Sequence, residues 1–423
     1  MENFLSAPSF PLVREVSETL DGLLPEGIRP SPGLEARSLP TWEALCAPLQ
    51  GLLPQIPPLE SRSNHPLEFT FPEQMFSLVY FHVEEYPSAR ALLEDLTDPW
   101  QPLPAGLPSG GVAKSTFFEA LQSRGLPQMM EVFDRLSRKA AKAVGMKHED
   151  LGELRALDGS LIEATLSMEW ADYTQTTHKA KVHLSFDLNR GLPRKIHLTD
   201  GKGPERPVVS GHLTPGETQV SDRGYQDHKQ FDRLQEEGKF FVCRIRATPQ
   251  RTLVKQLPIP SGSSIVFHAE VYLGDAQHRT QHRLRLVGVK LRRKILWIAT
   301  NRTDLTAAQI ALIYRLRWEI EKFFGWWKRY LKVYHLIARS PYGLFMQLLA
   351  GLITYLLLVI YFYHRYEERP SLFRLRQLRR DLRRERAVLS ALSTPPDGRP
   401  WELLVLALAW THFGRNTFLI AIL

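Results

Sequence analysis

Two changes of residue pattern, near residue 151 and near residue 301, constrain the fold more than any other feature of this chain. Residues 62–150 carry helical patterns, residues 151–300 carry short runs rich in β-branched and aromatic residues, and helical patterns return after residue 301. Runs of strands followed by a long helical stretch predict a mixed α/β fold. A chain of 423 residues is long enough for two or three structural units.

Strand-like runs fill the middle of the chain. The first four are LRALDGSLIEATL, AKVHLSFDL, RKIHLTDG and ETQVSD, and the second and third flank a plausible hairpin turn at residues 189–191. A short segment from Val208 to Leu213 precedes the fourth run, and residues 228–237 are expected to be helical. Four further strands are expected between residues 240 and 300: FFVCRIRAT, SSIVFHAEVYL, HRLRLVGVK and KILWIAT.

Helical patterns dominate the N-terminal region. Short helices are expected at residues 13–24, 42–53, 76–86 and 89–96. Two more, at residues 114–124 and 127–144, are separated by Gly125, and the second carries a basic face. This pair resembles a DNA-binding helix-turn-helix, but an ordinary helical hairpin with a solvated basic face fits the same residues. The basic residues of the second helix are Arg135, Arg138, Lys139 and Lys142.

The helix expected after residue 306 has an unusual polar stripe. Thr306 and Gln309 form a capping box, and apolar residues recur every three or four positions from Ile310 to Leu331. At 100° per residue, four polar residues fall within about 60° of one another at the edge of the apolar face; they are Tyr314, Arg317, Glu321 and Lys328. Arg315, Glu319, Lys322 and Trp326 are expected to point the other way. A carboxylate in line with two cations and a phenol is not typical of a solvated helix face.

This stripe resembles the YREK signature of a large group of bacterial DDE transposases, insertion-sequence family four. The residue types and the spacing of Tyr314, Arg317, Glu321 and Lys328 match the signature without departure. The similarity covers about residues 150–360 and is looser over residues 62–150. It implies an RNase H-like catalytic domain interrupted by a β-rich insertion, with a helical N-terminal DNA-binding region and a helical C-terminal region.

The resemblance also assigns two further acids. In the family the first Asp ends a strand and is often followed by Gly or Ser, which matches Asp158 in LRALDGS. The second Asp lies in a D-x-G-Y turn, which matches Asp222 in SDRGY. Each Asp alone could simply start a turn. In order with Glu321, they form the expected catalytic and metal-binding triad.

The implied chemistry is metal-dependent attack on DNA phosphodiesters. Three carboxylates suit hard cations, so two Mg²⁺ ions are expected, with Mn²⁺ able to substitute. Asp158 would be shared between the ions, with Asp222 and Glu321 each favouring one. Arg317 and Lys328 would grip phosphates and Tyr314 would hydrogen-bond to one. Relatives act as dimers in a paired-end complex, so a homodimer on double-stranded DNA is expected, bound to terminal inverted repeats and target DNA. In the insertion, Trp297 is interpreted as a core residue rather than a base-stacking one.

The charge balance agrees with a nucleic-acid partner. Lys and Arg number 54 against 45 acids, a net charge of +9. Seven arginines lie between Arg374 and Arg386, on a helix with leucines along one side. A DNA backbone is the expected partner of this helix, although a membrane-surface helix has the same pattern. The expected DNA contacts outside the YREK stripe are Arg379, Arg380, Arg383 and Lys114.

One segment supports a competing hypothesis. Gly343–Tyr363 is long and apolar enough to span a bilayer, although a helix buried in a large core has the same composition. We favour the core helix and expect no membrane partner. Two cysteines, Cys46 and Cys243, and an N-terminus without a signal-peptide pattern indicate a cytoplasmic, nucleoid-associated protein. Residues 401–423 are again apolar, which suits a last core helix or a dimer contact.

The resulting hypothesis is a DNA transposase that cuts the ends of an insertion sequence and joins them to target DNA. The alternatives are an RNase H-like nuclease or resolvase without strand transfer, and a membrane-anchored basic protein that binds nucleic acid or lipid. The expected organisation is an N-terminal arm (1–61), a helical DNA-binding region (62–150), the catalytic domain (151–238 and 304–366), a β-rich insertion (239–303) and an Arg-rich helical region (367–423).

Overall fold

The computed structural model describes residues 40–60, 66–98, 103–163, 168–171, 173–174, 177–203, 213–246, 250–275, 277–331, 333 and 335–393. The helix expected at residues 13–24, most of the segment that begins at Val208, and the apolar residues 401–423 lie outside these ranges.

A nine-stranded mixed sheet forms the centre of the described structure. Its spatial order is β3-β2-β1-β4-β5-β9-β8-β7-β6. The strands are β1 (Leu154–Glu163), β2 (Lys179–Asp187), β3 (Leu192–Asp200), β4 (Thr218–Ser221), β5 (Phe240–Arg244), β6 (Arg251–Gln256), β7 (Ile265–Leu273), β8 (Leu284–Leu291) and β9 (Lys294–Thr300).

The first five strands have the RNase H-like arrangement. β2 runs antiparallel between β1 and β3, whereas β4 lies parallel to β1 and β5 lies parallel to β4. This order and these directions confirm the expected mixed α/β, RNase H-like fold. The strand β5, at residues assigned to the insertion from the sequence, is hydrogen-bonded to β4 as the fifth strand of this unit.

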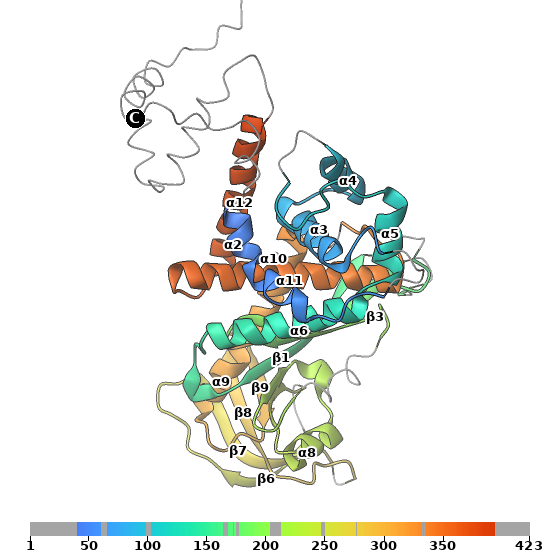
Figure 1. Ribbon diagram of the computed structural model, residues 1–423. Helices are drawn as coiled ribbons and strands as arrows, with labels where there is room; N and C mark the ends of the chain where they lie inside the picture. Colours follow the sequence, from blue (N-terminus) through green and yellow to red (C-terminus); the bar gives the residue numbers. More distant parts are fainter. Residues whose placement is uncertain are drawn as a thin grey trace, which may run out of the picture.

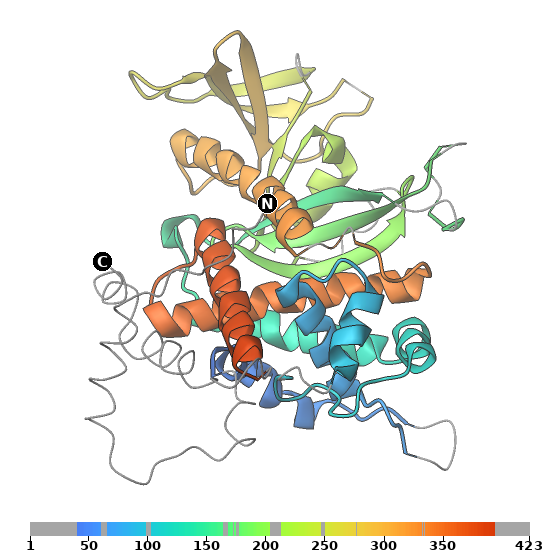
Figure 2. The same ribbon diagram turned by 90° about the horizontal axis from the view of Figure 1, so that it is seen from above.

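The remaining strands extend the same sheet. β9 pairs antiparallel with β5, and β8, β7 and β6 follow in turn. Figure 2 shows these yellow and gold strands at the side of the molecule opposite the blue helices α2–α5. β6 has no counterpart among the expected strands. All six of its residues are exposed, so its sequence lacks the alternating pattern of a half-buried strand.

Helices cover both faces of the sheet. The large core joins one face to α6 (Leu126–Ala143), α9 (Ala307–Leu316), α10 (Trp318–Tyr330) and α11 (Pro341–Tyr366), and a smaller core joins the other face of β5–β9 to α8 (His228–Glu236). In Figure 1, α11 crosses the middle of the molecule with the sheet below it. The other helices are α2 (Pro40–Gln50), α3 (Phe71–Glu84), α4 (Ala89–Thr97), α5 (Lys114–Ser123) and α12 (Leu372–Ser393).

The apolar helix α11 is a core helix in this structure. It is long and apolar enough to cross a membrane, but 94% of its most apolar 18-residue stretch is buried inside the protein. It packs against helices α2, α3, α5 and α6 and against β3. This burial supports the core-helix interpretation over the membrane span.

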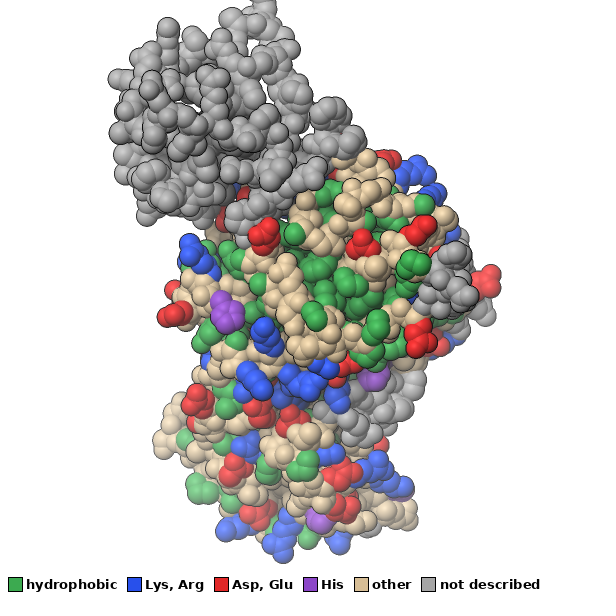
Figure 3. Space-filling model, in the orientation of Figure 1, with side chains coloured by type: hydrophobic (Ala, Val, Ile, Leu, Met, Phe, Trp, Pro, Cys, Tyr) green, Lys and Arg blue, Asp and Glu red, His purple; other side chains and the backbone are tan. Residues whose placement is uncertain are grey.

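The helices α5 and α6 form a tight pair whose second member is a structural layer. Gly125 joins them with a φ of 83°, and a Cβ there would lie 2.9 Å from the Phe71 ring. α6 packs on α11 and β3 through its apolar face, and its cations Arg138, Lys139 and Lys142 are exposed. A band of Lys and Arg side chains crosses the face in Figure 3 at the level of α6. This arrangement corresponds to the helical hairpin with a solvated basic face.

Candidate active site

The pairing of β1 with β4 brings two acids to the same level of the sheet. The parallel register joins Ala156 to Val220, so Asp158 and Asp222, each two residues further, are level. Asp158 lies within β1, which continues to Glu163, rather than at the strand end expected from the sequence. Its Oδ1 accepts a 2.9 Å hydrogen bond from the amide of Gly159.

Asp222 directly follows β4 and begins a short turn. Its Oδ1 accepts a 2.7 Å hydrogen bond from the amide of Arg223, and Tyr225, in the same turn, packs against Leu157 of β1. The Asp222 side chain is 39% exposed, so solvent reaches its carboxylate.

The helix that carries the YREK residues is divided at Arg317. The sequence predicted one continuous helix, but the structure has α9 and α10 on either side of this residue. The amide of Arg317 donates to the carbonyl of Tyr314, and the amide of Ile320 donates to that of Arg317, so both bonds span three residues instead of four. Because of this tightened turn, the side-chain directions predicted from a uniform rotation of 100° per residue are valid within α9 and within α10, but not from one helix to the other. Trp326 is one consequence: it is buried against Tyr355 instead of pointing outward.

Arg317 links two of the three acids. One terminal nitrogen donates to Glu321 Oε1 at 2.6 Å, and the other lies 4.0 Å from Asp158 Oδ2. Burial alone would lower the pKa of Arg317, but the neighbouring Tyr314, Glu321 and Asp158 outweigh it and raise the pKa. The guanidinium is therefore a permanent positive charge between two carboxylates.

Tyr314 and Arg244 contact the third acid. The Tyr314 hydroxyl donates to Asp222 Oδ1 at 3.3 Å, and the Arg244 guanidinium lies 3.4 Å from the same oxygen. Burial and the Asp222 charge raise the pKa of Tyr314, so its hydroxyl stays protonated at neutral pH. Through these two contacts, α9 and β5 both hold the Asp222 side chain.

Lys328 contacts the strand that carries Asp158. Its Nζ donates to the carbonyl of Leu161 at 2.5 Å, three residues beyond Asp158 in β1. Burial lowers the pKa of Lys328. The four YREK residues thus lie along one edge of the sheet together with both Asp side chains.

The donor set suits a hard divalent cation. Asp158, Glu321 and Asp222 supply only carboxylate oxygens, and their side chains are 25%, 31% and 39% exposed, so hydrated ions have access. Within the described ranges, no three Asp, Glu, His or Cys side chains lie close enough to hold an ion together in this conformation. Arg317 occupies the space between two of the acids instead.

The expected DNA contacts on α12 separate into two groups. Arg379 is 1% exposed and ion-paired with Glu85, and its guanidinium also donates to the carbonyl of Tyr330. The expectation that Arg379 faces DNA is corrected by this burial, because a side chain enclosed by α3 and α10 cannot reach a phosphate. Arg380 is exposed, and Arg383 is 43% exposed and 3.2 Å from Glu85.

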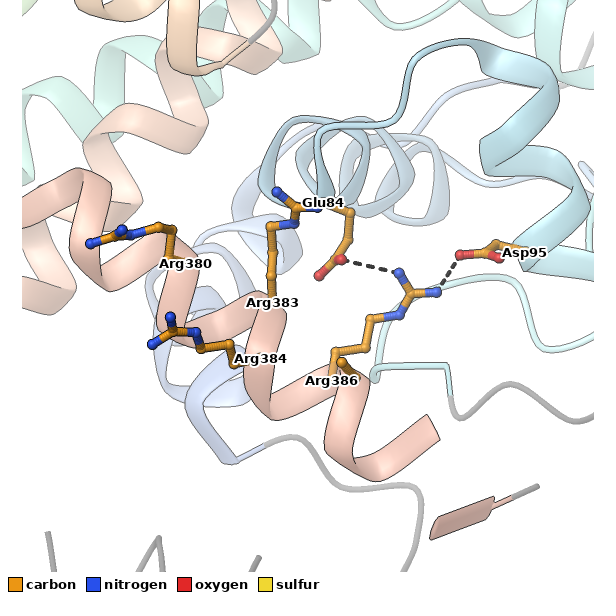
Figure 4. Close-up of a pocket in the computed structure, with 7 residues that line it drawn as sticks. Glu84, Asp95, Arg380, Arg383, Arg384 and Arg386 are labelled. Carbon is orange, nitrogen blue, oxygen red and sulfur yellow. Dashed lines mark hydrogen bonds and ion pairs between the residues drawn. The ribbon is translucent and has the colours of Figure 1, made fainter. Parts of the chain in front are cut away.

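Acidic residues of α3 and α4 form ion pairs that neutralise part of the positive charge of α12. Arg386 pairs with Glu84 and Asp95, and these three residues line a cavity of about 570 Å³ with Arg380, Arg383 and Arg384 (Figure 4). The repulsion among arginines that suggested a phosphate partner is therefore partly relieved inside the protein. Lys114, the remaining expected contact, is exposed at the start of α5.

One residue that contacts an acid, Arg244, and one that only follows Arg317 in the chain, Trp318, were missed from the sequence. Arg244 ends a strand whose composition gives no sign that it reaches Asp222, and only the β4–β5 pairing reveals the contact. Trp318 follows Arg317 and is 56% exposed, which is unusual for a large aromatic side chain. Its signal in the sequence was the position directly after the Arg of the signature.

Comparison with known proteins identifies the class. Residues 150–357 match the family model of the transposase DDE domain. The chain is 29% identical over 209 residues to the probable transposase for insertion sequence element IS5377 of Geobacillus stearothermophilus, covering 48% of this chain and 55% of the relative. It is 26% identical over 255 residues to the putative transposase for insertion sequence element IS4SA of Synechocystis sp., covering 58% and 70%.

A third relative, the putative transposase y4zB of Sinorhizobium fredii, is 26% identical over 235 residues, or 54% of this chain and 63% of the relative. The matched segments therefore cover 55% to 70% of the length of these three relatives. Among solved structures, a piggyBac transposase synaptic complex with hairpin DNA aligns with 87% of this chain and 82% of its own, at 11% identity and a TM-score of 0.40. Residues 150–357 of this chain are therefore similar to the transposase DDE domain, and the matched relatives are named as transposases, two of them of insertion sequence elements.

Proposed function

We propose that this protein cuts the terminal inverted repeats of its own insertion sequence and transfers the freed ends to target DNA. The observation that supports the proposal is the position of Asp158 and Asp222 at one level of an RNase H-like sheet, with Arg317 linking Asp158 to Glu321. The YREK spacing supports the narrower assignment to insertion-sequence family four. Within this proposal, the protein acts as a homodimer on paired ends in the cytoplasm, at the nucleoid.

The three acids would hold two divalent ions, Mg²⁺ or in its place Mn²⁺. Bound there, such ions supply activation of the attacking oxygen and neutralisation of charge on the leaving oxygen. The protein residues have separate tasks. Arg317 sets the distance between Asp158 and Glu321, and Tyr314 with Arg244 orients Asp222.

Phosphate contacts are assigned to the cations beside the acids. Arg317 presents a planar fork of donors that matches a phosphate, and its position beside both acids supports its assignment to the phosphate at the scissile bond. Lys328 contributes a compact charge from the next turns of α10. Among the more distant cations, Lys114, Arg380 and Arg383 are exposed and are assigned to the flanking duplex. Residues 62–150 are proposed to hold DNA as a region, with α5 and α6 contributing surface rather than a recognition helix.

Cleavage of the element's own end tests the proposal. A labelled duplex carrying the terminal repeat that flanks the gene is incubated with protein and Mg²⁺ or Mn²⁺. Three proteins are compared: the wild type, Glu321→Gln, and Glu319→Gln as a matched control. Glu319 lies on the same helix, and among the described residues it forms an ion pair with the exposed Lys322 alone, at 2.8 Å, so its loss should leave cleavage unchanged.

The outcomes separate the competing functions. Cutting at the repeat boundary by the wild type and Glu319→Gln, but not by Glu321→Gln, supports the proposal, and joining of the cut ends to a plasmid supports strand transfer. Cutting without joining identifies a nuclease or resolvase instead. Equal cutting by the wild type and Glu321→Gln rules out the triad.

A further inference from the structure

The β8–β9 hairpin of the insertion has an unusual tip. The antiparallel register pairs Leu291 with Lys294, so the turn consists of only Arg292 and Arg293. Two-residue hairpin turns favour Asn and Gly because their backbone needs positive φ angles. Here two arginines occupy the positions where small, permissive residues are the rule.

The backbone at the tip departs from what an arginine prefers. Arg292 has a φ of 29°, in the region that favours glycine. The two other non-glycine residues with positive φ in the described chain, Glu85 and Glu367, are both C-caps of helices, where this conformation is common. Arg292 therefore has a conformational cost that a glycine at this position would avoid. This cost lowers the stability of the hairpin, so stability does not explain the arginine.

The hairpin carries charge of one sign. Lys290, Arg292, Arg293 and Lys294 are all exposed, and no Asp or Glu occurs between Asp275 and Asp304. None of the four cations forms an ion pair with a residue that the structure describes. Leu291 and Ile295 beside them are 52% and 45% exposed. The four positive charges of this tip repel one another, and a bound polyanion would offset this repulsion.

The sheet register places this tip at the active-site edge. Arg244, which contacts Asp222, pairs with Ile298 in β9. β9 runs antiparallel to β5, so its start at Lys294 lies about 13 Å beyond Ile298, in the direction in which β4 and β5 end at the acids. β9 is two strands from β4, which adds about 10 Å sideways.

These distances match the dimensions of duplex DNA. The tip is on the order of 16 Å from Asp222, about half of the roughly 34 Å helical turn of B-DNA. We propose that the β8–β9 hairpin is a DNA-gripping arm, whose four cations bind backbone phosphates about half a helical turn from the scissile phosphate. This inference rests on the proposed function, because it takes the DNA held at the three acids as its reference point.

The salt dependence of DNA binding gives the first test. The double variant Arg292→Gly/Arg293→Gln removes two charges, and glycine suits the turn, so the hairpin should still form. Its matched control is Lys229→Gln/Arg233→Gln, which removes two exposed charges from α8, near the β7–β8 connection and at the opposite end of β8 from the β8–β9 turn. Dissociation constants for the terminal-repeat duplex are measured from 50 to 300 mM salt.

Loss of two phosphate contacts should reduce the magnitude of the negative slope of log K against log salt concentration by about 2 in the hairpin variant. The α8 variant should keep the wild-type slope. A wild-type slope in the hairpin variant would contradict the proposed DNA-gripping arm. An equal reduction of the slope in both variants would also contradict it, because the reduction would then reflect total charge alone.

A position-specific crosslink gives the second test. Cys46 and Cys243 are both buried, so a cysteine introduced by Arg293→Cys can be labelled selectively with a photo-crosslinker. Crosslinks from residue 293 should map about half a helical turn from the repeat boundary, and crosslinks from Arg233→Cys should not. Crosslinks from residue 293 scattered along the duplex overturn the arm.

The same material separates failure of the arm from failure of the proposed function. If residue 293 crosslinks at one fixed position while the wild type never cuts the end, the arm stands and the transposase proposal fails. If the wild type cuts the end but residue 293 gives no crosslink, the proposed function stands and the arm is wrong.

Discussion

Arg317 donates a 2.6 Å hydrogen bond to Glu321, one helical turn further along the chain, across the break between α9 and α10. Its other terminal nitrogen lies 4.0 Å from Asp158, which is on a different element. Two carboxylates that share a site repel each other, and a cation between them offsets the repulsion. The Arg of the YREK signature is therefore part of the internal order of the acid cluster, in addition to any contact with DNA.

Replacement of Arg317 tests this role. Arg317→Lys keeps the charge but loses the planar fork that faces two acids at once, and Arg317→Gln loses both. One lost charged hydrogen bond is worth about 1.5–3 kcal/mol, so end cleavage should slow by about 10- to 100-fold in Arg317→Lys and by more in Arg317→Gln. Single-turnover cleavage measures the effect. Arg315→Gln, exposed on α9, should match the wild type, and a wild-type rate in Arg317→Lys would contradict the role.

Tyr314→Phe isolates the hydroxyl that contacts Asp222. The ring is retained, so packing is preserved, and one hydrogen bond of 3.3 Å is removed. A loss of about 1 kcal/mol predicts a cleavage rate about fivefold lower. Because burial and Asp222 raise the pKa of Tyr314, the ratio of wild-type to variant rates should stay constant from pH 6 to pH 9. A ratio that changes with pH in this range would mean that the hydroxyl exchanges a proton during the reaction.

His82 predicts a loss of stability in mild acid. The ring is fully buried between the carbonyls of Leu331, at the end of α10, and Gln347, in α11. Burial lowers its pKa from 6.5 to about 4, because the charged form is poorly solvated there. The unfolded chain therefore binds this proton more readily, so stability is complete above pH 6.5 and falls as the pH drops toward 4.

Urea unfolding at pH 7.5 and pH 5.0 measures this effect. The wild type should lose about 2 kcal/mol from His82 between these values. His82→Asn should be less stable at pH 7.5 but should show a smaller further loss at pH 5.0. His364→Asn, an exposed control, should keep the wild-type difference. An unchanged pH difference in His82→Asn would assign the acid sensitivity to other groups.

The α12 ion pairs predict a large loss of stability at one arginine and almost none at another. Arg386 is 13% exposed and faces Glu84, itself 8% exposed, so Arg386→Ala leaves a buried carboxylate without its partner. Such losses cost about 3–5 kcal/mol. Arg380 is exposed, so Arg380→Ala should stay within about 0.5 kcal/mol of the wild type. Chemical unfolding decides between them, and equal values would show that α12 is not held by these pairs.

Salt should distinguish the same two arginines in DNA binding. If Arg380 contacts the flanking duplex as proposed, Arg380→Ala reduces the magnitude of the slope of log K against log salt concentration by about 1. Arg386 is engaged by Glu84 and Asp95, so Arg386→Met should leave this slope unchanged. A reduced slope in Arg386→Met would mean that the arginine exchanges its carboxylates for phosphates when DNA binds.

Local pattern predicted much of the fold. The turn at residues 189–191, the capping box at Thr306 and the apolar stripe from Ile310 depend on neighbours within one helix or one hairpin, and the structure contains all three. β6 escaped prediction because an exposed strand at the edge of the described sheet has no alternating burial to imprint on its sequence. The break at Arg317 escaped because the residues around it are compatible with an unbroken helix.

The sequence by itself determined the residue types and the spacing of the acids, the basic residues and the buried stripe, because these are properties of the chain alone. The tertiary structure decided which charges meet. Arg379 is sequestered by Glu85, 294 residues away in sequence, while Arg244 reaches Asp222 through strand pairing. The β8–β9 tip reaches the active-site edge only because β9 runs antiparallel to β5. Electrostatic energy depends on distance and burial, and only the packed sheet and helices set both.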